Sequence, residues 1–237
     1  YKYGKVNSEM HFYKNMQAYL KGQSENKHLV RFDYNDKEDM FDLVSYNKGG
    51  SILHMLRSYL GDEAFFLGLK QYLTIYKYQT AEVHQLRLIF EKLTGKDLNW
   101  FFNQWYFGGG HPNIEISYDY NTLRKTVTVN VIQLQTEKFK FPFAIDVFEA
   151  SKRTRHHVFV DDNDASFTFP YRKQPNLIQV NADGALLCVI NENKVLSDYI
   201  FQLKNADNYG HRREAFLEVA KKQDDKIAFS AVVGALD

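Results

Sequence analysis

The chain has 237 residues, 44% hydrophobic and 16% aromatic, which is a composition that builds a folded core and not a disordered chain. Thirty basic residues against 29 acidic ones leave a net charge of +1, so charge gives no support for nucleic acid or an anionic membrane as a partner. The single cysteine, Cys188, excludes an internal disulfide and lies in an apolar run that predicts a buried thiol.

No apolar run is long enough to span a bilayer, and the N-terminus has no signal-peptide pattern. The sequence therefore predicts no membrane span in this chain. It does not decide between an exported and a cytoplasmic protein, and we assign no compartment.

Between about Asp42 and Phe107 the apolar residues follow a helical spacing. We expect four helices in this stretch. The first begins at Asp42 or Ser45 and ends near Gly61, and the second is capped by Asp62. The third begins at Thr80 and ends at Gly95, and the fourth is capped by Asp97. The triplet Gly108–Gly110 followed by Pro112 ends the helical region.

After Pro112 the apolar residues alternate with polar ones, which is typical of β-strands. The expected strands lie at residues 113–120, 127–131, 141–147, 156–160, 167–171, 177–180 and 186–190, with turns at Asn121-Thr122 and Asp183-Gly184. Six or seven short antiparallel strands in this length predict a small β-sandwich.

From about Ser197 the helical spacing returns. Two apolar faces are expected, one of Ala215, Phe216, Val219 and Ala220 and one of Ile227, Ala231, Val232 and Leu236. This pair resembles one unit of a HEAT-like solenoid, and one such pair cannot bury its own face. We therefore expect the chain to be truncated at both ends. The expected fold class is α+β, with several domains.

Two segments resemble a known family. Val44-Ser45-Tyr46-Asn47-Lys48-Gly49-Gly50, with Asp39–Asp42 before it and Ile52–Arg57 after it, is similar to the Tyr-Glu-Lys-Gly region of the zinc metallo-aminopeptidases of aminopeptidase N and leukotriene hydrolase, the gluzincins. Trp100–Pro112 resembles the closing Trp…Gly-x-Pro segment of the same family. Two motifs in the right order are more specific than either alone. Asn47 departs from the pattern, because Glu is common there.

The resemblance implies three domains. Residues 1–110 would be the C-terminal helical part of a thermolysin-like catalytic domain, residues 111–192 a β-sandwich, and residues 193–237 the beginning of a HEAT-like helical domain. In the family, a His-Glu-x-x-His motif and a further Glu supply the zinc ligands and the general base. That motif does not occur in this sequence. The resemblance thus implies Zn²⁺ in the full-length protein, no metal bound by this chain, and the missing N-terminal part as its partner.

The functional tyrosine of the family maps onto Tyr46. Its implied role is to donate a phenolic hydrogen bond to the oxyanion that forms during hydrolysis of a peptide. A pKa near 10 would keep the donor proton in place at neutral pH. Gly49 and Gly50 follow one turn later on the same helical face, where the absence of side chains would leave room for a substrate backbone or, equally, for helix packing.

The other candidates favour structural roles. His54 follows an apolar residue on a helix, and His111 belongs to the turn before Pro112. His211 and Glu214 have a spacing compatible with a metal, but Arg212 and Arg213 between them indicate a solvated face. His156 and His157 alternate across a strand and share no face. The aromatic run Trp100–Phe107 could stack sugars, although its helical spacing favours the core.

The sequence thus predicts part of a zinc-dependent aminopeptidase that hydrolyses N-terminal residues from peptides, with the isolated chain inactive. A noncatalytic scaffold or interaction protein with the same architecture is the alternative. A third possibility, a sandwich-type carbohydrate-binding module, requires exposed aromatic side chains on one strand face.

Overall fold

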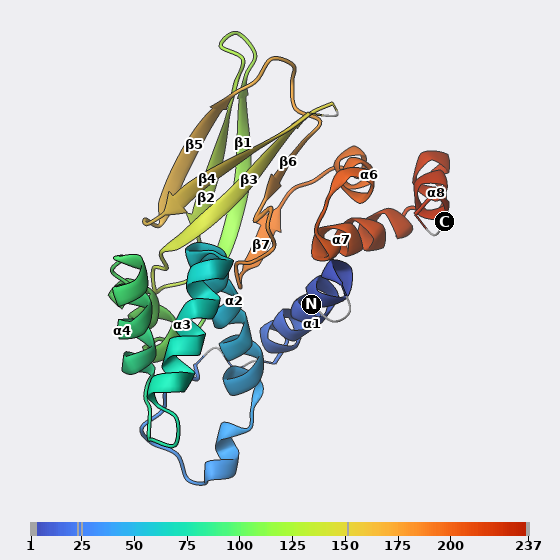
Figure 1. Ribbon diagram of the computed structural model, residues 1–237. Coiled ribbons are helices and arrows are strands. Elements are labelled where there is room, and N and C mark those ends of the chain that lie inside the picture. Colours follow the sequence, from blue (N-terminus) through green and yellow to red (C-terminus); the bar gives the residue numbers. More distant parts are fainter. Residues whose placement is uncertain (1–3, 23, 25, 151, 236–237) are drawn as a thin grey trace. The chain divides into compact units, whose positions relative to one another are not determined.

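The structure is a computed structural model that describes residues 4–22, 24, 26–150 and 152–235. It contains helices and two β-sheets (Figure 1). The described residues form two compact units, one of residues 15–111 and the other of residues 4–14 together with 112–235. The division into domains at residues 110 and 192 stays a prediction.

The first helix, α1 (Lys5–Leu20), belongs to both units and was not expected from the sequence. Its N-terminal part lies with the second unit, because the Glu9 carboxylate accepts the backbone N–H of Tyr209 at 2.9 Å and the rings of Tyr13 and Tyr209 meet edge to face at 6.0 Å. Met16 and Tyr19 are its buried residues. Two buried side chains make no apolar stripe, and so the helix left no clear pattern in the sequence.

The unit of residues 15–111 is helical apart from its loops. Its elements after α1 are the 3₁₀ turn η1 (Lys37–Met40), the π-helical turn η2 (Val44–Lys48), α2 (Gly49–Leu60), α3 (Asp62–Ile75), α4 (Val83–Thr94), α5 (Asn99–Phe102) and the π-helical turn η3 (Asn103–Phe107). Its fully buried large side chains include Ile52, Leu56, Phe90, Leu98, Phe101, Phe102 and Trp105. The helical spacing from Asp42 to Phe107 therefore predicted the presence of helices in this stretch, whereas η1 and the π-helical form of η2 and η3 were not expected.

Several helix starts differ from expectation. The residue before α3 is Gly61, which has a positive φ of 84°. Asp62 is the first helical residue, and its carboxylate binds Arg57. Helix α4 starts at Val83 and not at Thr80, because the backbone N–H of Glu82 is capped by the side chain of Gln85. Gly61 and Gly95 end α2 and α4 as expected.

Helices α3 and α4 approach each other closely at a glycine. A Cβ atom on Gly68 would lie 2.4 Å from the ring of Phe90, and that ring stacks on Phe65 with 5.7 Å between centroids. Phe90 can therefore reach the backbone of α3 only because residue 68 has no side chain.

In the part of the chain that the structure describes, seven strands form two sheets. They are β1 (Asn113–Asn121), β2 (Thr126–Gln133), β3 (Phe141–Glu149), β4 (Lys152–Val160), β5 (Asp164–Pro170), β6 (Leu177–Val180) and β7 (Val189–Glu192), in the orders β5-β2-β1-β7 and β4-β3-β6. Strands β1 and β2 form the expected hairpin, with Tyr118 opposite Val129. Burial alternates along β2 but is nearly continuous in β3. The ring of Phe148 in β3 also meets that of Phe201 in the helix α6 (Leu196–Asn205), with 5.7 Å between centroids. The strand β3 is thus covered on both faces.

The last strand corrects the expectation of a purely antiparallel sandwich. Strand β7 pairs with β1 in parallel, and it begins at Val189 instead of Leu186. The side-chain amide of Asn181 accepts a hydrogen bond from the backbone N–H of Leu186 and donates one to the backbone carbonyl of Leu186. The backbone groups of Leu186 are therefore bonded to a side chain instead of a neighbouring strand. Pairing starts where the N–H of Val189 donates to the carbonyl of Pro112 at 2.9 Å.

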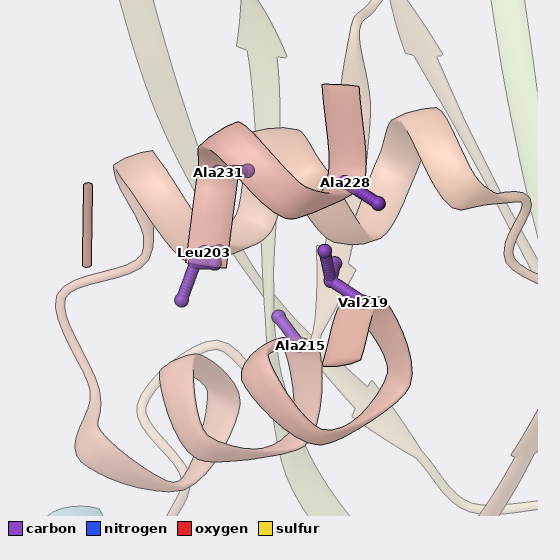
Figure 2. Packing of buried hydrophobic residues seen from close by; sticks show 5 residues of the cluster. All are labelled: Leu203, Ala215, Val219, Ala228 and Ala231. Carbon is purple, nitrogen blue, oxygen red and sulfur yellow. The ribbon is translucent and has the colours of Figure 1, made fainter. Parts of the chain in front are cut away.

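Three helices follow: α6 (Leu196–Asn205), α7 (Tyr209–Ala220) and α8 (Lys226–Val233). Figure 2 shows their shared core, which consists of Leu203, Ala215, Val219, Ala228 and Ala231. The prediction for Ile227 was wrong: its side chain is 67% exposed, because Ala228 and Ala231 form the inner face of α8. Leu236 lies outside the described residues. The HEAT-like character of this layer stays a prediction.

Candidate functional site

Tyr46 lies in the middle of the π-helical turn η2. Its side chain is 62% exposed, and its ring is tilted against that of Phe41 with 6.1 Å between centroids. Lys48, two residues later on the same turn, is fully buried. The turn thus presents a phenol to the surface and anchors itself through its buried lysine.

The two glycines that follow Tyr46 have different surroundings. A Cβ atom on Gly50 would meet no atom within 4 Å, so this position borders open space. Gly49 is buried, and a Cβ atom there would lie 3.4 Å from the side chain of Leu29. Gly50 therefore has the open surroundings that a passing substrate backbone would need, whereas Gly49 packs against a neighbour.

The start of the π-helical turn is held by a partly buried ion pair. Arg31 donates from Nη1 and Nη2 to the two carboxylate oxygens of Asp42 at 2.8 and 3.2 Å, and its Nη2 also donates to Ser45 Oγ at 2.8 Å. Burial alone would raise the pKa of Asp42. The hydrogen bonds and charge of Arg31, together with the N–H of Ser45, outweigh it and hold that pKa well below its usual range.

The end of the turn is tied to the second sequence motif. Lys48 Nζ donates to the carbonyl oxygen of Gly108 at 3.5 Å and lies 5.8 Å from the centroid of the Tyr19 ring. The Tyr19 hydroxyl donates to the carbonyl of Gly110 at 3.4 Å, and its ring meets His111 edge to face. Burial lowers the pKa of Lys48 to about 8. The structure therefore brings the Tyr-x-Lys-Gly and Gly-Gly-Gly-His-Pro segments together.

Asn47, which departs from the family pattern, is turned toward α1. Its amide donates to the backbone oxygen of Asn15 at 3.3 Å. The substitution therefore affects a contact with a helix and does not alter the Tyr46 side chain directly.

A cavity of about 990 Å³ opens within the same unit. Its lining comes mainly from the loop of residues 26–42 and includes Arg31, Asp42 and Phe41. Phe41 lines this cavity and also contacts the ring of Tyr46, which is itself not a lining residue. Sequence reasoning missed Arg31, because no periodic pattern marks this loop, and it treated Asp42 only as a possible helix cap.

The aromatic run Trp100–Phe107 forms core. Phe101, Phe102, Trp105 and Tyr106 are buried, and Phe102 stacks on Tyr106 with 4.7 Å between centroids. On the sandwich, the exposed aromatics Tyr120 and Phe159 belong to different sheets. These positions give no support for stacked sugars.

The remaining histidines have structural surroundings. His54 is partly buried on α2, and His156 stacks on Phe169 at 4.2 Å while His157 points to the other face of β4. Both ring nitrogens of His211 are used, one with the carbonyl of Asn181 at 2.9 Å and one with the Gln179 amide at 3.1 Å. His211 is thus held by structural contacts, whereas Arg213 and Glu214 on the same helix are exposed, in agreement with the expected solvated face.

The metal alternative at His211 and Glu214 has no geometric support. Glu214 accepts a hydrogen bond from Gln202, and burial lowers the pKa of His211. Among the described residues, no group of three or more His, Cys, Asp or Glu side chains could hold a metal ion. These residues therefore do not fit a zinc site.

Two further expectations concern the thiol and the membrane. Cys188 is buried as predicted, and burial raises the pKa of its thiol well above the usual range. Within the described part of the chain, no helix has the length and apolar character to cross a membrane.

Comparisons with known proteins agree with the motifs. Residues 1–105 match the family described as the peptidase family M1 domain. Tricorn protease-interacting factor F2 of Thermoplasma volcanium is 35% identical over 104 residues, which are 43% of this chain and 13% of the relative. Probable aminopeptidase 2 of Sulfurisphaera tokodaii is 36% identical over 102 residues, 43% of this chain and 12% of the relative. The chain therefore spans about an eighth of the length of these relatives.

A solved structure shares the fold. The crystal structure of Legionella pneumophila aminopeptidase A in complex with aspartic acid matches 98% of this chain and 29% of its own, with a TM-score of 0.77 and 16% identity. At this identity the match supports the mixed helix and sheet architecture and nothing about chemistry.

Proposed function

We propose that this chain, whose residues 1–105 match the peptidase family M1 domain, is part of a zinc-dependent aminopeptidase that removes N-terminal residues from peptides. The zinc ligands and the general base would come from the part of the protein outside this sequence. The described residues offer no metal site of their own, so the isolated chain is proposed to be inactive.

The position of Tyr46 is the observation that carries the proposal. It lies within the family match, its phenol is exposed, and Gly50 beside it borders open space. A rigid ring with a neutral hydroxyl suits a donor that must meet an oxyanion formed on a scissile carbonyl. We therefore assign Tyr46 the role of stabilising the transition state of peptide hydrolysis. Gly50 is the proposed neighbour of the substrate.

A scaffold or interaction protein with this architecture is the alternative. It is compatible with the same fold match, because fold alone does not decide activity. The two proposals differ in what they require of the upstream sequence: an enzyme needs His-Glu-x-x-His and a further Glu, and a scaffold does not.

The test is an assay of the full-length protein. We expect it to release amino acids from aminoacyl-arylamides, to contain zinc, and to lose activity with a chelator and regain it with added zinc. The isolated 237-residue chain, assayed in parallel, should show neither activity nor bound zinc. A full-length protein that is folded, lacks zinc and is inactive would favour the scaffold.

A further inference from the structure

The direction of the Tyr46 side chain depends on its backbone. Its ring is largely exposed, so packing constrains it little, and the ring follows the π-helical turn that carries it. The groups that hold this turn therefore determine where the phenol points. A π-helical turn is an uncommon conformation and is found where the surrounding contacts favour it.

Asp42 anchors the N-terminal side of the turn at two points. Its carboxylate Oδ1 accepts the N–H of Ser45 at 2.8 Å, and its backbone oxygen accepts the N–H of Tyr46 at 3.2 Å. Both bonds end on the residue that bears the phenol or on its immediate neighbour. A change in the position of Asp42 would thus directly change the position of the Tyr46 backbone.

Arg31 in turn fixes Asp42. It binds the carboxylate through two nitrogens, and the side chains of Arg31 and Asp42 are only 13% and 19% exposed. A two-point, largely buried ion pair restricts orientation far more than a surface pair. Arg31 also donates to the Ser45 hydroxyl, which gives the guanidinium a separate contact with the turn. Because the pKa of Asp42 is depressed, the pair stays charged at neutral pH.

We propose that Arg31 and Asp42 are positioning residues, which hold the π-helical turn so that the Tyr46 hydroxyl points at the reacting carbonyl. The inference rests on the proposed function of Tyr46 and adds the residues that act through it. Such residues should change turnover and leave substrate affinity almost unchanged, because a misdirected donor weakens the transition state and not the ground state.

The experiment uses the full-length enzyme with Asp42→Ala and Arg31→Met. We expect kcat to fall about 10- to 100-fold with little change in KM, since small misplacements of a catalytic group have effects of this size. Asp62→Ala is the control, because Asp62 forms a two-point but more exposed pair with Arg57 in the same unit, at 2.7 Å for each bond, away from Tyr46. Its kcat should stay at the wild-type value.

A double-mutant comparison separates positioning from general damage. On a Tyr46→Phe background, Asp42→Ala should cause little further loss, because the hydroxyl that it positions is gone. An equal loss on both backgrounds, or no loss in either single variant, would overturn the proposal. If Asp42→Ala fails to fold or loses zinc, Ser45→Ala and Arg31→Lys decide in the same design. Full activity of Tyr46→Phe would instead refute the proposed function itself.

Discussion

Lys48 Nζ lies 3.5 Å from the carbonyl oxygen of Gly108, and this contact joins two segments that are 60 residues apart in the sequence. One segment carries Tyr46 and the other closes the helical region before the sandwich. The lysine of the Tyr-x-Lys-Gly pattern therefore has a structural task, while the tyrosine two residues earlier stays at the surface.

The buried lysine predicts a pH-dependent stability. Burial lowers the pKa of Lys48 from 10.5 to about 8, so between these values the unfolded chain binds more protons than the folded one. The free energy of unfolding should then rise with pH across this window, by up to about 3 kcal/mol for this residue. Lys48→Met should remove that rise, as measured by urea denaturation from pH 8 to 10.5.

Lys70→Met is the control for that experiment, because Lys70 lies at an exposed position of α3. Its unfolding free energy should follow the wild-type pH dependence. Ionisation of tyrosines and of Cys188 is common to all three proteins and cancels in the difference. Parallel curves for the wild type and Lys48→Met would show that the lysine is not buried as described.

A second prediction concerns the contact between α3 and α4. Gly68→Ala should lower the free energy of unfolding by about 1 to 3 kcal/mol, because the new methyl group would overlap the Phe90 ring. Gly50→Ala should instead raise it by about 0.5 to 1 kcal/mol, since that position is open and helical. Thermal or urea unfolding of the two variants would check this. Equal effects would contradict the close approach at Gly68.

A third prediction concerns the link between the sandwich and the last helices. The side chains of Lys194 and Glu192 are 4% and 6% exposed and lie 2.9 Å apart, and Tyr118 also donates to Glu192. Lys194→Met would leave a buried carboxylate without its cation, at a cost of about 3 to 5 kcal/mol at neutral pH. Urea denaturation measures this loss.

The pH dependence of the Lys194→Met variant provides its control. Burial raises the pKa of Glu192 above its ordinary 4.5, so the folded state binds the extra proton and stability falls as pH rises through the folded pKa. The deficit of Lys194→Met should shrink in acid, where Glu192 is neutral. Adding Glu192→Gln should restore part of the stability at neutral pH. A deficit that is independent of pH would point to lost packing instead of an unpaired charge.

Local patterns in the sequence predicted most elements, and contacts between distant residues explain the exceptions. Alternation along Val127, Val129 and Val131 was enough to place β2. The parallel pairing of β7 was not predictable, because it depends on the Asn181 side chain binding the backbone of Leu186. Helix α1 was missed because only two of its residues, Met16 and Tyr19, are buried.

The candidate site shows the same division. Tyr46, Gly49 and Gly50 were proposed from a motif, which records a residue's place in a family without its surroundings. Arg31 lies in a loop without periodicity, and its role depends on an ion pair with a residue 11 positions away. The π-helical turn that carries Tyr46 has no distinct pattern in the sequence, since its residues fit an ordinary helix equally well.

The most direct test of the account is the steady-state kinetics of Tyr46→Phe in the full-length enzyme, with zinc content and thermal melting measured alongside. Removing the hydroxyl keeps the ring and its contact with Phe41. Loss of one oxyanion donor should lower kcat by about 10² to 10³, with KM, zinc and melting temperature nearly unchanged. A kcat close to that of the wild type, in a protein that retains its zinc, would contradict the assignment of Tyr46 as the transition-state donor.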